Sequence, residues 1–251
     1  MKKTKIFICC TEQSGENISS NILSRIDIDK FQIDGVCGKQ SEEYISNKIY
    51  DLSEFKSIGF FEIIFSISKY IKMINNLKDY IIKNDYDLII TIDSPDFNYN
   101  LVNQLRKLNF NKKIIHIVAP TVWAWRLYRA KKFANIYDEI FLLFNFEKKY
   151  FNFQNLKKTF IGHPIFHIKK RETKENYKYI AFLPGSRQNE VLKLIKYFNH
   201  IEEYINKNNL NFRIFIPTLP HLSPLIKECI KGWKTETVVS TDVSKFNDYY
   251  D

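Results

Sequence analysis

Thr91-Ile92-Asp93-Ser94-Pro95-Asp96-Phe97-Asn98 is the stretch from which the fold of this chain is best read. It continues an apolar run that begins at Leu88, and such a run is typical of a buried parallel strand. Two carboxylates, a proline and an amide then stand where that strand must end. Because open α/β sheets bind ligands outside the carboxyl ends of their strands, Asp96 is a candidate catalytic residue. A cap of the following helix explains Asp96 equally well.

The composition is that of a globular protein in a reducing compartment. The 251 residues, 45% hydrophobic and 26% charged, are enough for one or two domains. The four cysteines show no CxxC spacing, so we expect free thiols and no zinc site. No stretch approaches the ~20 apolar residues of a membrane span, and the N-terminus lacks the pattern of a signal peptide. We therefore expect a cytoplasmic protein, either free or on the cytosolic side of a membrane.

The net charge of +10 is compatible with three classes of partner: nucleic acid, anionic lipid or a phosphorylated substrate. Many of the lysines stand in scattered pairs and not in one block. This scatter favours an ordinary solvated surface, so we predict no nucleic-acid partner.

Strands and helices alternate along the chain, which predicts an α/β fold with Rossmann-like domains. We expect an N-terminal domain over residues 1–170, a polar linker over 171–178 and a second Rossmann-like domain over 179–251. The second domain holds only three predicted strands, whereas a doubly wound half has roughly five or six. We therefore expect either a fragment or a chain that a partner completes.

A long helix that ends near Ile82 is predicted from apolar residues at helical spacing. Phe61 and Phe65 add a second apolar ridge to it. With Lys69 and Lys72 nearby, that ridge could lie in a membrane interface. Packing of the phenylalanines against a neighbouring element is the alternative.

Three turns that follow predicted strands carry groups for binding an anion or a ring. Ser14-Gly15 opens a helix, although a plain strand-to-helix turn explains it as well. Trp125 and Arg126 could stack on a ring and pair with phosphate, or the tryptophans could pack into a core. Leu183-Pro184-Gly185-Ser186-Arg187 offers backbone donors and a guanidinium to a diphosphate.

These features favour glycosyl transfer over other chemistries. The chain has no dinucleotide fingerprint and no Walker loop. Two residues, Ser94 and Pro95, separate Asp93 from Asp96, so these aspartates do not form the Asp-x-Asp pair that holds a metal with a sugar nucleotide. We predict a reaction without metal or cofactor. In it Asp96 takes a proton from an acceptor hydroxyl and Arg187 stabilises the leaving diphosphate.

The same segments resemble the lipid A disaccharide synthases, a family of glycosyltransferases in Gram-negative bacteria. The matching motifs are Glu12–Glu16, Gly35–Gly38, Ile58–Glu62, Ile92–Asn98, His116–Arg126, Phe146-Glu147, Gly162–Pro164 and Leu183–Arg187 with Glu190. In the first of these turns Glu16 replaces the family's aspartate and Thr11 its glycine. The resemblance covers nearly all of this chain but only part of a family member.

The resemblance implies a GT-B fold, in which two Rossmann-like domains face a cleft, and an inverting β-1,6 transfer. The donor would be UDP-2,3-diacylglucosamine and the acceptor 2,3-diacylglucosamine 1-phosphate, giving lipid A disaccharide 1-phosphate and UDP. Residues 1–170 would form the acceptor and membrane-side domain, and residues 179–251 part of the UDP-sugar domain. The family is peripheral to the inner membrane, on its cytosolic face.

The resemblance also implies roles for individual residues. Asp96 would be the general base, and Arg187 would support the departing UDP. The implied substrate-binding residues are Glu12, Ser14, Gly15, Asp87, Asn98, Trp125, Arg126, Gly185, Ser186 and Glu190. Phe60, Phe61 and Phe65 would meet acyl chains or lipid headgroups.

Two other interpretations remain open. One is a different GT-B enzyme, such as a UDP-N-acetylglucosamine transferase or epimerase, although the Trp-Ala-Trp-Arg segment at 123–126 argues against it. The other is a non-catalytic or partner-dependent remnant. The short second domain and the net charge favour this last interpretation, whereas the presence of Asp96 and Arg187 disfavours it.

Overall fold

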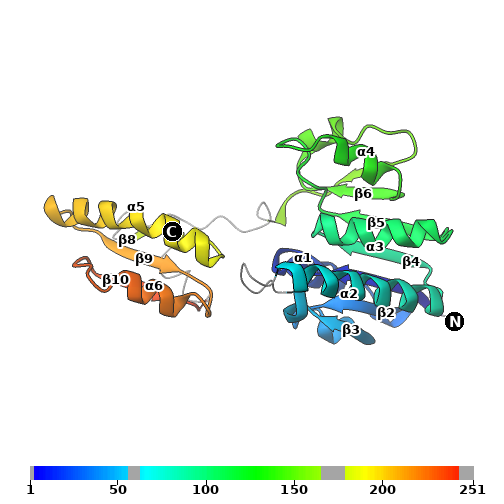
Figure 1. Cartoon of the computed structure of the whole chain (residues 1–251), viewed down its shortest axis with the longest axis horizontal. Coiled ribbons are helices and arrows are strands. Elements are labelled where there is room, and N and C mark those ends of the chain that lie inside the picture. The colour runs from blue at the N-terminus through cyan, green and yellow to red at the C-terminus, as the bar shows by residue number, and fades with distance from the viewer. Residues whose placement is uncertain (1–2, 56–62, 165–178, 243–251) are drawn as a thin grey trace. The chain divides into compact units, whose positions relative to one another are not determined.

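The computed structural model describes residues 3–55, 63–164 and 179–242, with side chains from residue 67 onward in the helix that begins at Ile63. The chain divides into two compact units, Met1–Ile168 and Lys169–Asp251. Figure 1 shows both. Each unit is described by itself below.

A parallel sheet of seven strands forms the centre of the first unit (Figure 1), in the order β3-β2-β1-β4-β5-β6-β7. The strands are β1 (Thr4–Cys10), β2 (Phe31–Cys37), β3 (Asn47–Asp51), β4 (Leu88–Ile92), β5 (Lys113–Ile117), β6 (Glu139–Leu142) and β7 (Lys157–Phe160). The chain first adds strands on one side of β1 and then crosses over to place β4 on its other side. The β1/β4 boundary is therefore the topological switch point, where open α/β sheets bind ligands.

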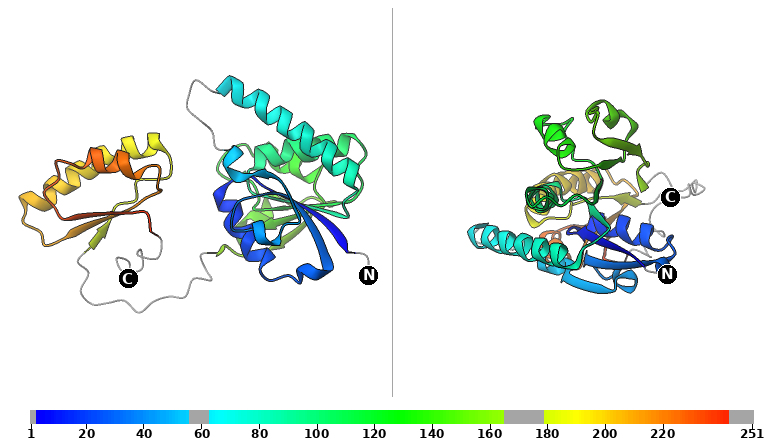
Figure 2. Two further views of the ribbon diagram at one scale, coloured as in Figure 1. Left: turned by 90° about the horizontal axis from the view of Figure 1, so that it is seen from below. Right: turned by 90° about the vertical axis from the view of Figure 1, so that its right-hand side faces the viewer.

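Helices cover both faces of this sheet (Figure 2). They are α1 (Gln13–Leu23), α2 (Ile63–Asn84), α3 (Pro95–Lys107) and α4 (Tyr128–Ala134), with short 3₁₀ turns at Ile28–Lys30, Glu42–Tyr44, Leu52–Phe55 and Asn145–Lys149. Along β1, Phe7 and Cys9 join the core beneath α2, α3 and α4, while Ile6 and Ile8 join the core beneath α1. Because both faces are buried, the strand is apolar throughout instead of alternating.

The predicted long helix is confirmed as α2, which ends two residues beyond Ile82. Ile74, Leu77 and Ile81 lie in the core, as helical spacing requires. Ile67 and Ile71 continue the same helical spacing, but they are 54% and 53% exposed. Between Ile67 and Ile71, α2 therefore presents two apolar side chains to solvent.

Strand β3 was not predicted from the sequence. Its residues, Asn47-Lys48-Ile49-Tyr50-Asp51, form the edge of the sheet and none of them is fully buried. An edge strand with one neighbour needs no continuous apolar run, so the pattern that identified the other strands is absent here.

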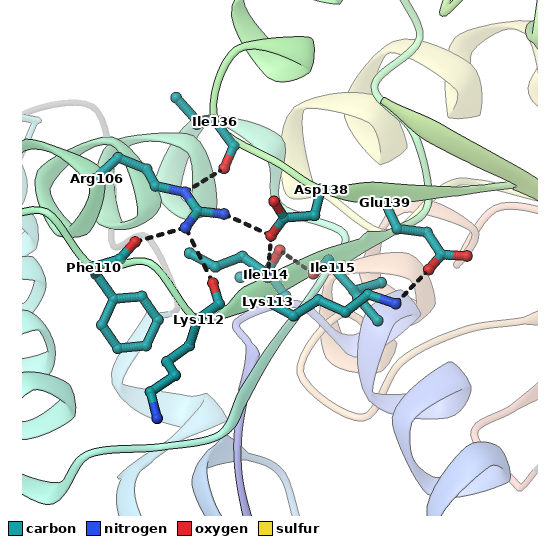
Figure 3. Close-up of polar contacts among 10 residues, drawn as sticks. Arg106, Phe110, Lys112, Lys113, Ile114, Ile115, Ile136, Asp138 and Glu139 are labelled. Atoms are coloured by element: carbon teal, nitrogen blue, oxygen red, sulfur yellow. Dashed lines mark hydrogen bonds and ion pairs between the residues drawn. The ribbon is translucent and has the colours of Figure 1, made fainter. Parts of the chain in front are cut away.

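Ion pairs and hydrogen bonds connect the strands at the amino-terminal edge of this sheet (Figure 3). The Arg106 guanidinium donates to the carbonyl oxygens of Ile136, at 2.9 Å, and Phe110, at 2.6 Å, and pairs with Asp138 at 2.6 Å. Nearby, the buried carboxylate of Glu139 accepts hydrogen bonds from Lys113, Lys157 and Thr159 at 2.8–3.0 Å. These contacts join β5, β6, β7 and α3 at one end of the sheet.

The second unit is a smaller parallel sheet of order β10-β9-β8, formed by β8 (Tyr179–Ala181), β9 (Arg213–Pro217) and β10 (Thr237–Ser240). Two helices, α5 (Gln188–Lys207) and α6 (Ser223–Cys229), pack on one face of it. Val191 and Ile205 of α5 and Ile226 of α6 meet Ile214 and Ile216 of β9 there. The three strands predicted for this domain are present, and the α/β fold class is confirmed.

Candidate active site

The loops after β1 and β4 meet at the topological switch point. Ser14 Oγ donates a hydrogen bond of 2.5 Å to Asp93 Oδ2, and the Ser94 amide donates to Asp93 Oδ1 at 2.9 Å. A Cβ at Gly15 would lie only 3.2 Å from Asp93 Cβ and from the Ile92 carbonyl oxygen. Glycine at this position therefore lets the start of α1 approach the end of β4 closely.

The turn from β4 into α3 is tight and unusual. Asp93 and Ser94 both adopt left-handed backbone conformations, with φ of 55° and 43°. Such conformations are costly for residues other than glycine and persist when surrounding contacts fix them. Asn98 supplies one such contact, because its Nδ2 donates to the Asp93 carbonyl at 2.8 Å. Asn98 itself is fully buried, so it supports the turn and is not available to a substrate.

Asp96 stands in the first turn of α3, immediately after this tight turn. Its side chain is 77% exposed, and its Oδ1 accepts a short hydrogen bond from Arg129 Nη2 in α4. Ser94, and not Asp96, occupies the N-cap position of the helix. The geometry therefore presents the carboxylate at the carboxyl edge of the sheet, where its guanidinium partner orients it.

The loop between β5 and α4 carries the two tryptophans outside the core. Trp125 and Trp123 are 58% and 45% exposed, so the interpretation that both indoles pack into a core is wrong. The Arg126 guanidinium lies 3.8 Å from the centre of the Trp125 ring. Trp123 meets Phe146 edge-on at 5.4 Å and hydrogen-bonds to Glu147, whose pKa burial raises. One tryptophan is fixed against the next loop, and the other is paired with a cation.

In the second unit, the turn after β8 satisfies its own backbone donors. Glu190 Oε2 accepts hydrogen bonds from the amides of Ser186 and Arg187 at 3.1 and 3.2 Å. Arg187 Nη1 donates to the same carboxylate at 3.0 Å. These bonds, the Ser186 amide foremost, lower the pKa of Glu190. The donors predicted for a diphosphate are thus already occupied by Glu190.

Gly185 is required in that turn for two reasons. Its φ of +90° lies in the region that favours glycine, and an added Cβ would come within 2.6 Å of Glu190 Oε2. The side chain of Arg187 is 78% exposed and extends into solvent. The backbone amides of the turn are therefore bonded to Glu190, while much of the Arg187 side chain remains accessible to solvent.

The predicted site residues fall into two groups, one in each unit. Ser14, Gly15, Asn98 and Asp96 gather at the β1/β4 switch, and Trp125 and Arg126 lie on the loop from β5 that leads to Asp96's partner, Arg129. Gly185, Ser186, Arg187 and Glu190 form the turn in the second unit. Glu12 is the exposed N-cap residue of α1, and its side chain makes no capping hydrogen bond.

Asp87 does not belong to either group. It precedes β4 and accepts a hydrogen bond from the Lys5 amide at 2.9 Å, which places it at the amino-terminal edge of the sheet. The seven strands are parallel, so this edge is opposite the one that carries Asp96. A role for Asp87 beside the substrate does not fit this position. Phe60 and Phe61 lie outside the described residues, as does the side chain of Phe65.

Two residues that matter at the first group were not assigned to it from the sequence. Asp93 links α1 to the β4 turn, and Arg129 orients Asp96. The convergence of strand ends at one edge was a usable signal for Asp93, since Ser14 follows the neighbouring strand. No comparable signal connects Arg129 with Asp96 across 33 residues of sequence.

The described residues lack two features, a cluster of metal-binding side chains and a membrane-spanning helix. Among residues 3–55, 63–164 and 179–242, no group of three or more His, Cys, Asp or Glu side chains is arranged to hold a metal ion. Within the same ranges, no helix has the length and apolar character needed to cross a bilayer.

Comparison with solved structures identifies the fold. A putative UDP-N-acetylglucosamine 2-epimerase from Listeria monocytogenes superposes with a TM-score of 0.63 and 13% identity, over 99% of this chain and 72% of that one. MurG of Acinetobacter baumannii gives a TM-score of 0.52 at 9% identity, over 96% of this chain and 68% of MurG. Identities this low show the fold alone, which is that of GT-B glycosyltransferases and UDP-GlcNAc epimerases.

Sequence comparison is more specific. Lipid-A-disaccharide synthase from Rickettsia prowazekii (strain Madrid E) is 35% identical over 85% of this chain, and that from Rickettsia felis 36% identical over 95%. The chain spans 59% and 65% of the length of these two relatives. A family model described as lipid-A-disaccharide synthetase matches residues 6–247. The chain therefore belongs to the lipid-A-disaccharide synthase family.

Proposed function

We propose that this protein is a hexosyltransferase of lipid A biosynthesis, acting on UDP-2,3-diacylglucosamine and 2,3-diacylglucosamine 1-phosphate. The products are lipid A disaccharide 1-phosphate, with a β-1,6 linkage, and UDP. Family membership supports the general reaction. The observation that carries the assignment to a site is the exposed Asp96 carboxylate at the carboxyl edge of the sheet, oriented by Arg129.

The transfer needs one base and one group that accepts developing negative charge. Asp96 takes the proton from the 6-hydroxyl of the acceptor as that oxygen attacks C1 of the donor sugar. The bond between C1 and the diphosphate oxygen breaks, and UDP leaves with the electron pair. Inversion at C1 follows from a single displacement, because no enzyme nucleophile intervenes.

Arg129 holds the carboxylate of Asp96, the proposed base, in one orientation. Its side chain is only 15% exposed and reaches Asp96 from the first turn of α4, whereas the aspartate itself is open to solvent. An ordered partner reduces the number of carboxylate orientations that compete with the productive one. We assign Arg129 as a positioning residue and not as a catalytic one.

Arg187 and the turn before α5 are proposed to receive the diphosphate of the donor. The guanidinium is exposed and long enough to swing from Glu190 to a phosphate oxygen. The Ser186 and Arg187 amides become available only when Glu190 releases them. When the donor binds at this turn, its diphosphate thus replaces the Glu190 carboxylate as the acceptor of these hydrogen bonds.

Association with the cytosolic face of the inner membrane is part of the proposal. Ile67 and Ile71 are exposed near the start of α2, and Lys69 and Lys72 are exposed beside them. A helix that offers apolar and basic side chains together suits a lipid interface.

The Asp96→Asn variant tests the base. We expect disaccharide formation to fall by roughly 10²–10³-fold, the loss typical of one lost transition-state contact. Asp85→Asn is the matched control, because its side chain is 79% exposed but it lies before β4 at the opposite edge. The assay measures UDP release and disaccharide from the two lipid substrates, with EDTA present. Wild-type turnover by Asp96→Asn would exclude the assignment.

A further inference from the structure

Helix α5 carries apolar side chains on two of its sides. Val191 and Ile205 face the core of the second unit. A second set, which we call the α5 seam, consists of Leu194, Tyr197, Ile201 and Tyr204. The exposed fractions are 66% for Tyr197, 42% for Ile201 and 62% for Tyr204. A surface helix needs only one apolar stripe for its own core, so the second stripe marks an interaction site.

The seam faces away from the neighbouring helix. Helix α6 packs against α5 and β10 (Figure 1). Asn199 and Asn206 of α5 line a groove on that side, together with Cys229 of α6. Because residues two apart on an α-helix point about 200° apart, Ile201 and Tyr204 lie on the side opposite these asparagines. The seam is therefore open on a helix whose other flank is already packed.

The spacing of the seam fits a helix as its partner. Its four residues are three, four and three positions apart, which is the a–d–a–d pattern along which two helices pack. They extend over about three turns of α5. Tyrosine at the two d positions adds a large apolar area, and its hydroxyl can stay in water at the rim. The seam thus favours an amphipathic helix as its occupant.

Positive charge flanks the seam on one side. Lys193, His200 and Lys207 lie three or four residues from the seam tyrosines and are exposed. Among the described residues of the second unit, neither lysine takes part in an ion pair. Glu190, one turn before the seam, accepts hydrogen bonds within its own turn, and Glu203 lines the groove beside α6. The flank therefore attracts acidic groups.

We infer that the α5 seam docks an amphipathic helix of a partner protein, with apolar side chains against the seam and acidic side chains along its lysine flank. Opposite charges at the edges of a helix pair determine partner choice. A second copy of this chain fits less well, because two antiparallel seams related by a twofold axis would bring one lysine flank against the other. The inference does not depend on the proposed function, since helix docking requires no sugar substrate.

The experiment measures binding of a fluorescein-labelled peptide to the whole chain by fluorescence anisotropy. The peptide has about three heptads, with leucine at positions a and d and glutamate at e and g, so that like charges keep its own copies apart. One comparison peptide has the same composition with the leucine spacing scrambled, and another has lysine in place of every glutamate. Circular dichroism shows whether the bound peptide is helical.

Two variants alter the seam or its flank, and two matched controls remove similar groups elsewhere. The test variants are Tyr197→Ser with Tyr204→Ser, and Lys193→Ser with Lys207→Ser. The controls are Leu192→Ser with Ile28→Ser, and Lys227→Ser with Lys234→Ser. The two apolar control side chains are 39% and 40% exposed, and the control lysines are exposed as well. Thermal unfolding followed by circular dichroism shows that each variant is folded.

We expect the acidic peptide to bind as a helix, and to bind more weakly as the salt concentration rises. Loss of the two tyrosines should raise the dissociation constant at least about tenfold. Loss of the two flanking lysines should raise it about fivefold at low salt. Both control pairs should bind as the wild type does, and the scrambled and lysine peptides should bind poorly.

Four results would overturn the inference. They are no binding of the acidic peptide, wild-type affinity in the seam variants, equal losses in seam and control variants, and a lysine peptide that binds as tightly as the acidic one.

Two other occupants of the seam can be distinguished in the same experiment. If light scattering shows a dimer that the tyrosine pair abolishes, the seam joins two copies and the inference is wrong. It is also wrong if the peptide is blocked by co-expression of the part of the Rickettsia felis relative that this chain does not span. Peptide binding by a chain that makes no disaccharide would leave the docking site standing and contradict only the proposed function.

Discussion

Arg129 Nη2 hydrogen-bonds to Asp96 Oδ1, so the exposed candidate base is held by a largely buried guanidinium from a different helix. The pair connects α3 with α4 at the carboxyl edge of the sheet. This relationship gives Arg129 a role that does not depend on direct contact with substrate.

Replacing Arg129 should lower turnover more than substrate affinity. Arg129→Ala removes the partner that orients Asp96, and misplacement of a catalytic group by about 1 Å costs on the order of 10²-fold. We expect kcat to fall by roughly 10–100-fold with a smaller change in KM. Arg129→Lys keeps a positively charged donor group, the ammonium, but loses the planar guanidinium, so it should recover part of the loss.

Lys131→Ala is the control for Arg129, because Lys131 is exposed on the same helix and does not contact Asp96. Steady-state kinetics with the acceptor lipid varied provides kcat and KM separately. A change confined to KM in Arg129→Ala would assign the residue to acceptor binding instead.

Glu190→Gln should strengthen the binding of UDP. The carboxylate now occupies the Ser186 and Arg187 amides, and an incoming diphosphate must displace it against like-charge repulsion. A neutral amide still closes the turn but repels no phosphate. We expect a dissociation constant several-fold lower, measured by titration calorimetry with UDP alone.

Arg187→Ala should have the opposite effect on the same measurement, because it removes the cation that we propose receives the diphosphate. Glu203→Gln, exposed near the other end of α5, should leave UDP affinity unchanged. Weaker UDP binding by Glu190→Gln would show that Glu190 organises the site for its ligand and does not compete with it.

Glu139→Gln should remove an acid-sensitive part of the stability. Burial acts to raise the pKa of Glu139, but hydrogen bonds from Lys113, Thr159 and Lys157 outweigh it and lower the pKa to about 2. Because the folded-state pKa lies below the ordinary glutamate value of 4.5, the stabilisation is present above pH 4.5 and lost as pH falls towards 2. A shift of this size corresponds to about 3 kcal/mol.

Urea unfolding at a series of pH values tests the Glu139 prediction. The wild type should lose stability between pH 4.5 and 2 more steeply than Glu139→Gln. Asp79→Asn, whose 71% exposed carboxylate pairs with Lys78, should follow the wild-type curve. Identical slopes for wild type and Glu139→Gln would mean that the three contacts contribute nothing to acid stability.

His116 should make the free energy of unfolding fall at a higher pH than the one at which the contribution of Glu139 is lost. Burial lowers its pKa from 6.5 to about 3, and its Nδ1 lies 2.7 Å from Thr91 Oγ1 in the core. The unfolded chain therefore binds a proton between pH 6.5 and 3 that the folded chain excludes. Stability should fall as pH drops below 6.5, by up to about 1.4 kcal/mol per pH unit.

Comparison of His116→Gln with the exposed His200→Gln between pH 6.5 and 4.5 isolates this contribution, since Glu139 titrates below that window. The first variant should show a flatter dependence on pH and the second an unchanged one. An unchanged slope in His116→Gln would contradict the assignment.

The sequence predicted the central strands and their sharp exits because burial on both faces leaves long apolar runs, as in β1 and β4. It did not predict β3, whose half-buried edge position permits polar residues. The sequence analysis assigned Glu190 to substrate binding and did not predict its contacts with the Ser186 and Arg187 amides, although an acidic residue three positions after a helix N-cap is a capping signal.

Other parts of the site could not be predicted from local patterns. The contact of Arg129 with Asp96 depends on how the seven-residue helix α4 is placed, and no periodicity encodes that placement. The burial of Asn98 follows from the left-handed turn at Asp93 and Ser94, which the residue types permit but do not require. Asp87 was assigned by resemblance, although its position before a strand already indicated the opposite edge.

The two edges of the large sheet differ in how many contacts one substitution disturbs. The amino-terminal edge holds Arg106, Asp138 and Glu139 in contacts that cross three strands, so one substitution there affects several neighbours. The carboxyl edge presents Trp123 and Trp125 on a loop. A substitution in that loop leaves the contacts of the opposite edge intact, so the candidate site and the scaffold can be altered separately.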